Sequence, residues 1–320
     1  EQVYEAAEVP GQTPPAIDAY PPSNLVRNSL AEGLRLEAVL GVNPFRFGFV
    51  ASTDTHNAAP GNTEERDYEG GGGANDASPE RLIERSLTSN PGGLAVVWAE
   101  ENSRDAIFSA LRRRETYATS GTRPVLRFVA GELAGLGCDQ PDFVERAYRT
   151  GTPMGGELGA VRGAQSPRFA VLGLKDPGSP ARPGADLQDV QIVKAWLDAD
   201  GVPQERVFEV ASAGDNAIDP ATCAARHAGA GSFCRLWTDP DFDPGQRAFY
   251  YARLLESPTC RWSTYVCRAA GVDPLSPDCA AQAAAAEPAF AGCCLNEGND
   301  PFVSPVIQER AWSSPIWYRP

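Results

Sequence analysis

Histidine is scarce in this chain of 320 residues, which contains only His56 and His227. Histidine chemistry is therefore confined to these two positions. The chain also lacks an apolar run of about 18 residues, which excludes a transmembrane helix. It contains no Gly-x-Ser-x-Gly motif, and this absence leaves a serine-hydrolase mechanism with little support.

Basic residues are few relative to acidic ones. The sequence has 28 Lys and Arg against 42 Asp and Glu, and its net charge is −14. A field of this sign repels phosphate backbones, so nucleic acid is not expected as a partner. The basic run Arg112-Arg113-Arg114 falls late in a predicted helix, where it complements the helix dipole as a solvated face. A small anionic substrate stays compatible with the acidity, because bound divalent metals invert the local field.

The first half of the chain has almost no cysteine, with Cys138 as its single example. The other seven are Cys223, Cys234, Cys260, Cys267, Cys279, Cys293 and Cys294. Paired metal-binding histidines are absent there, and the spacing of Cys260 and Cys267 is too wide for a zinc knuckle. Disulfides in an oxidising compartment are therefore favoured over a zinc ribbon or reduced thiols.

The cysteines predict an extracytoplasmic protein, either periplasmic or secreted. The first residues, Glu1-Gln2-Val3-Tyr4, show no basic region followed by an apolar one, so a signal peptide is not expected here. Either such a segment has been removed or the chain is a piece of something longer.

The most informative stretch is residues 45–57, an apolar run that ends in Asp54-Thr55-His56. Helical spacing predicts a helix from Ser23 or Asn24 to Leu40, stopped by Gly41, and then a strand over 45–51. Where an Asp and a His follow a strand, both side chains can share one cation. The alternative from spacing alone is a turn in which the Asp acts as a cap.

A second unit begins with a predicted strand over 94–99, which leads through Glu100-Glu101-Asn102 into a helix capped by Asn102 or Ser103. In α/β domains, active sites lie at the carboxyl ends of such strands. Glu100 and Glu101 therefore either contact the substrate or support the site residues, or they are charges in the first turn that interact favourably with the helix dipole. The four glycines at 70–73 predict a mobile surface loop, with a lid as the alternative. His227 has no partner at ligand spacing and is interpreted as a surface residue.

Beyond Gly121 the pattern changes to strands, at 122–130, 168–175, 189–199 and 205–211. Asp200-Gly201 predicts a hairpin between the last two. Asp243 and Pro244 predict the start of a helix with Phe249, Ala252 and Leu255 on one face. The expected organisation is an extended lead-in at 1–22, an α/β part at 23–121, an antiparallel β-sandwich-like module at 122–212, and a Cys-rich tail with one helix at 213–320.

Several stretches resemble a known family, catalogued as domain of unknown function 3604. They are residues 52–57, 97–108, 114–121, 239–244, 246–253 and 307–312, and the match spans about 23–320. The Asp-x-His pair also looks like the last metal-binding motif of the PHP (polymerase and histidinol phosphatase) superfamily of metal-dependent hydrolases. The resemblance to the first family is to its C-terminal half.

The resemblance implies an α/β fold in which residues 23–121 are the C-terminal part of a PHP-like distorted (β/α) barrel, with the tail docked back on it. It implies divalent metal ions, zinc, manganese or iron, for which Asp54 and His56 match the final ligand pair. The family also places a His-x-His and other ligands upstream, and this sequence lacks them. A fragment of a chain about twice as long explains the lack better than a degenerate, metal-free relative.

The expected function is that of a metal-dependent hydrolase acting on a phosphoester or a related ester or amide bond of a small molecule. The alternative is an exported non-catalytic binding or structural module with a degenerate barrel. The sequence identifies no catalytic residue and no organic-cofactor motif, and it leaves the oligomeric state open.

Overall fold

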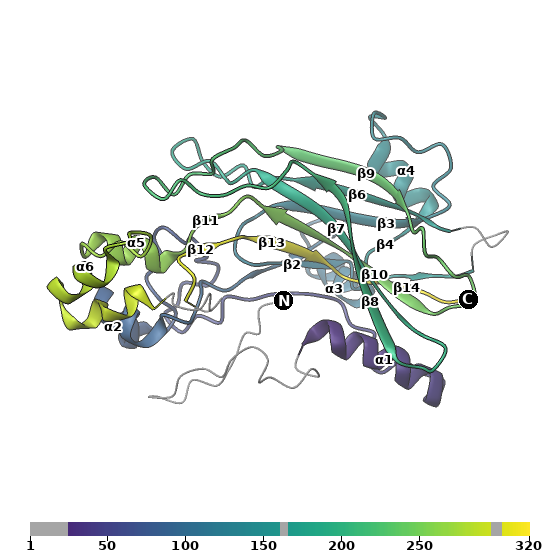
Figure 1. Cartoon of the computed structure of the whole chain (residues 1–320). Coiled ribbons are helices and arrows are strands. Elements are labelled where there is room, and N and C mark those ends of the chain that lie inside the picture. Colours follow the sequence, from purple (N-terminus) through teal and green to yellow (C-terminus); the bar gives the residue numbers. More distant parts are fainter. Residues whose placement is uncertain (1–24, 161–165, 296–302) are drawn as a thin grey trace.

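The computed structural model describes residues 25–160, 166–295 and 303–320. Two stacked sheets form the body of this part (Figure 1). The larger sheet contains eight of the described strands, β1 (Leu94–Val97), β2 (Thr116–Thr119), β5 (Glu157–Leu158), β7 (Leu187–Leu197), β8 (Pro203–Ser212), β10 (Ala248–Glu256), β13 (Arg310–Ser313) and β14 (Ile316–Tyr318). Their pairing is antiparallel except between β14 and β5.

Strand β10 is the centre of the larger sheet. Along one edge it pairs with β7, which continues to β8. Along its other edge it pairs with β13 and then, further along, with β14. Strand β13 leads through β2 to β1, and β14 leads to β5. Segments distant in sequence therefore meet in one sheet.

The smaller sheet has the order β4-β3-β6-β9. Its strands are β3 (Val125–Gly131), β4 (Gly151–Pro153), β6 (Arg168–Leu174) and β9 (Ser232–Thr238). Helix α4 (Phe143–Thr150) covers its outer face, where Phe143 and Ala147 pack against Val129 and Ala170. The inner face stacks on the larger sheet and forms the main core.

The side chains of β10 alternate between the two faces of the larger sheet, so this strand contributes to two separate cores. Tyr250, Ala252 and Leu254 face the smaller sheet and join the main core. Phe249 and Tyr251 point to the opposite face of the larger sheet and join a second core. Side chains of a strand alternate between its two faces, so a strand covered on both sides is apolar nearly throughout.

The second core is closed by helix α1 (Val26–Leu40), which lies across β7 and β8 (Figure 1). Its buried stripe contains Leu30, Ala31 and Leu34. Gly41 ends the helix with a φ of 78°, a left-handed conformation that suits glycine. The chain then continues without regular secondary structure over the same face of the sheet, where Phe49 completes this core.

The remaining elements gather at the end of the sheet away from α1 and α4 (Figure 1). They are η3 (Gly73–Asp76), α2 (Pro79–Ser86), β11 (Thr259–Cys260), α5 (Trp262–Ala269), α6 (Cys279–Ala285), η5 (Pro288–Cys294) and β12 (Val306–Ile307). We call residues 262–294 the cystine lobe; α2 packs on it. Helix α3 (Arg104–Arg113) stands apart beside β1 and is capped by Ser103.

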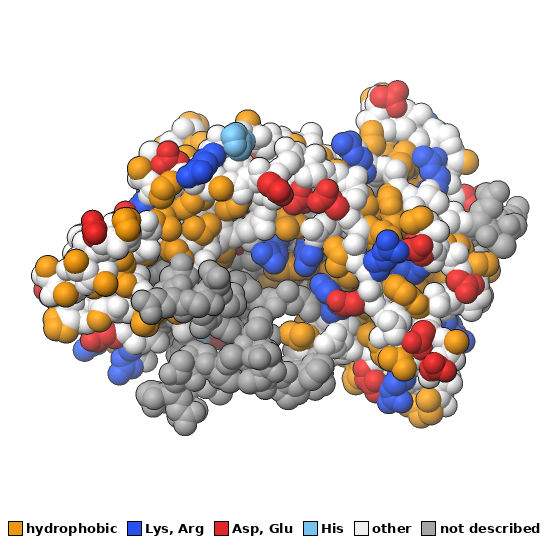
Figure 2. Space-filling model, viewed as in Figure 1, with side chains coloured by type: hydrophobic (Ala, Val, Ile, Leu, Met, Phe, Trp, Pro, Cys, Tyr) orange, Lys and Arg blue, Asp and Glu red, His pale blue; other side chains and the backbone are white. Residues whose placement is uncertain are grey.

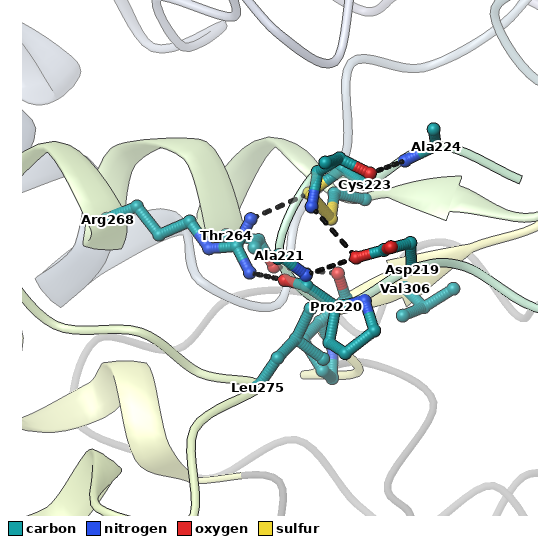
Figure 3. The surroundings of a disulfide bond; sticks show 12 residues. Asp219, Pro220, Ala221, Cys223, Ala224, Thr264, Arg268, Leu275 and Val306 are labelled. Carbon is teal, nitrogen blue, oxygen red and sulfur yellow. Dashed lines mark hydrogen bonds between the residues drawn. A yellow bond between two sulfur atoms is a disulfide. The ribbon is translucent and has the colours of Figure 1, made fainter.

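All eight cysteines pair, as Cys138–Cys234, Cys223–Cys260, Cys267–Cys293 and Cys279–Cys294. The predicted disulfides are thus confirmed, and they indicate an oxidising, extracytoplasmic environment. Cys260 is fully buried. Arg268 of α5 donates from Nη1 to Sγ of Cys223 over 3.0 Å and from Nη2 to the carbonyl of Pro220 (Figure 3). Arg268 thereby fastens the 219–224 loop to the lobe beside a buried crosslink.

The predicted PHP-like (β/α) barrel is wrong. Such a barrel needs parallel strands, each followed by a helix that returns the chain to the same end. In the described residues the strands are mainly antiparallel, they pair across long sequence distances, and none of the sheets closes on itself. The fold is a mixed α/β arrangement of two stacked sheets with helices on their outer faces. The expected α/β class with a barrel at 23–121 is replaced by this architecture.

The predicted domain boundaries at 122 and 212 remain a prediction. The larger sheet combines strands from before, between and after them, such as β2, β7 and β10. The expected lead-in at 1–22, and the caps Ser23 and Asn24, lie outside the described residues. In the described part of the chain, no helix has the length and apolar character of a membrane span.

Two local predictions also fail. Residues 45–51 do not form the predicted strand: Phe45 lies in a turn, the N–H of Phe47 donates to the carbonyl of Phe45 over 2.8 Å, and the rest of the run has no regular secondary structure. The predicted helix after Asp243 is instead the strand β10. Its run of aromatic and aliphatic residues is buried on both faces, and such a run shows no period that separates strand from helix.

Candidate functional site

The segment that carries Asp54 and His56 is held by side chains of the sheet. The backbone N–H of Phe49 donates to Oγ of Ser314 over 2.8 Å, and its carbonyl accepts from Oγ1 of Thr116 over 2.8 Å. These bonds satisfy the backbone without a partner strand, which explains why the predicted strand is not regular.

The segment then passes close to the loop before β1. Gly93 N–H donates to the carbonyl of Ser52 over 2.9 Å. A Cβ atom at Gly92 would lie 2.6 Å from Cα of Thr53, and Gly92 has a φ of 80°. Only glycine fits this approach, so the backbone just before Asp54 is placed by direct contact.

Asp54 and His56 themselves are exposed, whereas Thr53 and Thr55 are partly buried. Asp54 has a φ of 49°, the left-handed region that few non-glycine residues adopt. The N–H of His56 donates to the carbonyl of Gly71 over 2.7 Å. Within the described part of the chain, neither side chain has a hydrogen-bond or ion-pair partner. A free carboxylate and a free imidazole therefore stand two residues apart on a fixed backbone.

These two side chains fit part of a metal site. Carboxylate oxygen and imidazole nitrogen are both ligands of zinc, manganese and iron. A catalytic zinc centre needs about three protein ligands. Among the described residues, no three His, Cys, Asp or Glu side chains come together as a group that could hold a metal ion. Asp54 and His56 alone are therefore too few for such a centre.

The glycine-rich stretch at 70–73 lies beside this pair. Asn57 Nδ2 donates to the carbonyl of Gly70 over 2.7 Å, and Gly72 N–H donates to Oδ2 of Asp76 over 2.6 Å. Asp76 is buried and also accepts from Oγ of Ser86 over 2.9 Å. The stretch is thus tied to both α2 and the His56 segment. Its predicted mobility, and the alternative of a lid, stay predictions.

The other residues that the sequence singled out make no hydrogen bond or ion pair with Asp54 or His56 in the described residues. Glu100 and Glu101 are exposed in the bend that precedes Ser103 and α3. His227 is exposed, and its backbone pairs with the side chain of Asn216.

A cluster of buried carboxyl groups was not expected from the sequence. Glu256 ends β10 and is 1% exposed, and Glu309 precedes β13 and is 4% exposed. Oγ of Ser120 donates to Glu309, and the N–H of Trp262 donates to Glu65. Oε1 of Glu65 and both carboxyl oxygens of Glu256 are buried as well. These residues lie where the sheet meets the cystine lobe.

Burial raises the pKa of all three groups. For Glu256 the pKa rises to about 8, first through burial and then through the charge of Glu309; Thr122 and Lys175 oppose the rise. Burial also raises the pKa of Glu309 and of Glu65, and the charge of Glu309 adds to the rise at Glu65. The cluster is therefore protonated in part at neutral pH. These three carboxyl groups do not come together in an arrangement that could hold a metal ion.

The fold and the site define a disulfide-linked protein of two stacked sheets that presents an exposed Asp–His pair beside the loop that precedes β1. The chain belongs to the family described as Protein of unknown function (DUF3604), whose model matches residues 3–293. This match confirms the family that the sequence resembles. It does not extend to the PHP superfamily or to a C-terminal half. Comparison with curated proteins and with solved structures gave no match.

Proposed function

We propose that this protein takes part in metal-dependent hydrolysis and that Asp54 and His56 are two of its metal ligands. The observation that supports the proposal is their free side chains, two residues apart, on a backbone fixed by Gly92 and Gly71. A divalent ion held there would supply an activated water for attack on a phosphoester or a related ester or amide bond.

The missing ligands would come from outside the described residues. A longer form of the chain, of which these residues are the C-terminal half, is the source that the family resemblance suggests. The exposure of both side chains agrees with this proposal, because a partner segment can approach them from solvent. The role of this chain's own residues is to hold one carboxylate and one neutral imidazole in place.

A second candidate is an exported, non-catalytic binding or structural module. The observation that favours it is that the described residues contain four disulfides but no group able to hold a metal by itself. Metal analysis of the full-length protein separates the two candidates. Stoichiometric zinc, manganese or iron supports the hydrolase, and a metal-free protein supports the module.

The test compares D54N and H56Q with the wild-type full-length protein. We expect both variants to lose bound metal and, in parallel, hydrolysis of bis(p-nitrophenyl) phosphate or p-nitrophenyl acetate. H227Q is the matched control, because it removes the other histidine of the chain from an exposed position. It should leave both quantities unchanged. Full metal occupancy and unchanged hydrolysis in D54N would refute the proposal.

A further inference from the structure

A pocket of about 500 Å³ lies near the end of β14, remote in sequence from Asp54 and His56. It is open to solvent and is lined by residues that include Glu157, Gly159, Gly245, Arg247 and Arg319. Its walls come from three places, the end of β5, the turn before β10 and the end of β14. Pockets of this volume accommodate small molecules rather than polymers.

The positive charges of the pocket are anchored on a buried carboxylate. Glu37 of α1 has a side chain that is 3% exposed, and its Oε1 lies 3.4 Å from Nε of Arg319 and 3.9 Å from Nε of Arg247. Arg46 contributes a third guanidinium, 3.3 Å from the same oxygen. Glu37 thus gathers three arginines at one place.

The three arginines are paired to different extents. Glu157 is the second carboxylate, in contact with Arg46 and 3.4 Å from Nη1 of Arg319. Arg46 and Arg319 therefore each contact both carboxylates, whereas Arg247 contacts Glu37 alone. The terminal nitrogens of Arg247 have no hydrogen-bond partner in the described residues. Its side chain is 44% exposed on the pocket wall.

We propose that this pocket binds a small organic anion through a carboxylate or phosphate group held by Arg247 and Arg319. Guanidinium groups match both anions geometrically and remain charged at every physiological pH. Glu157, at the same wall, would accept from a hydroxyl or ammonium group elsewhere on the ligand. Neither Asp54 nor His56 lines this pocket, so a test of the pocket is independent of a test of the proposed hydrolysis.

Isothermal titration calorimetry with inorganic phosphate and with succinate tests the proposal. We expect one of the two to bind saturably to the wild-type protein. R247Q should weaken that binding by about tenfold or more, as loss of a charge-assisted hydrogen bond predicts. R247Q is the informative variant, because its one ion pair spans 3.9 Å and its loss should not disturb folding.

R235Q is the matched control, since Arg235 is an exposed arginine on β9 of the other sheet. It should bind the probe as the wild type does, and unchanged circular dichroism should confirm that R247Q is folded. Saturation by phosphate identifies a phosphorylated ligand, and saturation by succinate identifies a carboxylate. Absence of saturation by both probes, or equal affinity in wild type and R247Q, overturns the proposal.

Discussion

Glu256 lies at the end of the central strand with a carboxyl group that is almost entirely removed from water. Its pKa is raised from the ordinary value of 4.5 to about 8 by burial and by the charge of Glu309; Asp176 adds to the rise, while Thr122 and Lys175 oppose it. Between these two pH values the folded state holds a proton that the unfolded state has lost. Stability contributed by the protonated group is thus complete below about pH 4.5 and is lost as the pH rises through about 8.

We therefore expect the free energy of unfolding to fall between pH 5 and pH 9, and E256Q to reduce that fall by roughly 1–3 kcal/mol. Glutamine keeps the shape of a protonated glutamate and cannot ionise. Urea denaturation at both pH values measures the effect. E101Q, at an exposed position, is the control and should show the wild-type slope. An equal slope in E256Q would mean that Glu256 is not protonated in the folded state.

At this scale the sequence identified residues that carry a local pattern. Asp54 and His56 are visible because they are two residues apart, and their role stays a prediction. Glu256 and Glu309 carry no such pattern, because they come together only through strand pairing. Arg247 and Arg319 are likewise joined by the buried Glu37 of a distant helix. Sites assembled by long-range contacts leave no spacing to recognise in one sequence.

At the scale of elements, the irregular segment that carries Asp54 is in close contact with Gly92. G92A would place a Cβ atom 2.6 Å from Cα of Thr53 and 2.8 Å from the carbonyl of Ser52, at a φ of 80°. We expect it to destabilise the protein by roughly 2–4 kcal/mol, from the strained φ and the clash together. The backbone before Asp54 must move to relieve the overlap.

G201A separates these two contributions. Gly201 has a φ of 77°, but a Cβ atom there would meet nothing within 4 Å. G201A should therefore reduce the free energy of unfolding by only about 1 kcal/mol, because the positive φ is its only source of strain. Hydrogen exchange of the His56 amide, which donates to Gly71, should accelerate in G92A and not in G201A. Similar costs and similar exchange in both variants would show that the contact with Thr53 does not fix the segment.

Elements with strong end signals were predictable. Gly41 and Ser103 mark the end of α1 and the start of α3, and Asp200-Gly201 forms the turn between β7 and β8. Strand β10 was missed because burial on both faces removes the periodicity that separates strand from helix. The barrel was wrong because strand and helix order along the chain does not reveal which strands pair, and β2 pairs with β13 from the other end of the sequence.

At the scale of the whole molecule, the net charge is −14. Acidic and basic side chains are interspersed on the face shown in Figure 2. The described residues of that face show no extended basic track of the kind that binds a phosphate backbone. The arginines beside Glu37 therefore stand out as a local group in an acidic protein.

The two ends of the molecule differ in how they are held together. The main core between the sheets consists of large apolar side chains such as Phe128, Phe169 and Tyr250. The core of the cystine lobe is smaller, and three of its buried members are Cys267, Cys279 and Cys293. Small cores bury too little apolar surface to be stable alone, and disulfides commonly compensate. The lobe should therefore depend on its crosslinks far more than the sheets do.

We predict that replacing all four cysteines of Cys267–Cys293 and Cys279–Cys294 with serine opens the lobe and leaves the sheets folded. These bonds close loops with sequence separations of 26 and 15, and each should contribute roughly 2–4 kcal/mol. Limited proteolysis should then cut within residues 262–294, while the sheet fragments persist. The control is C138S/C234S, which removes the crosslink between the α4 layer and β9 and should leave the lobe protected. If the lobe resisted the protease equally with and without its two disulfides, apolar contacts with α2 would have to be its main support.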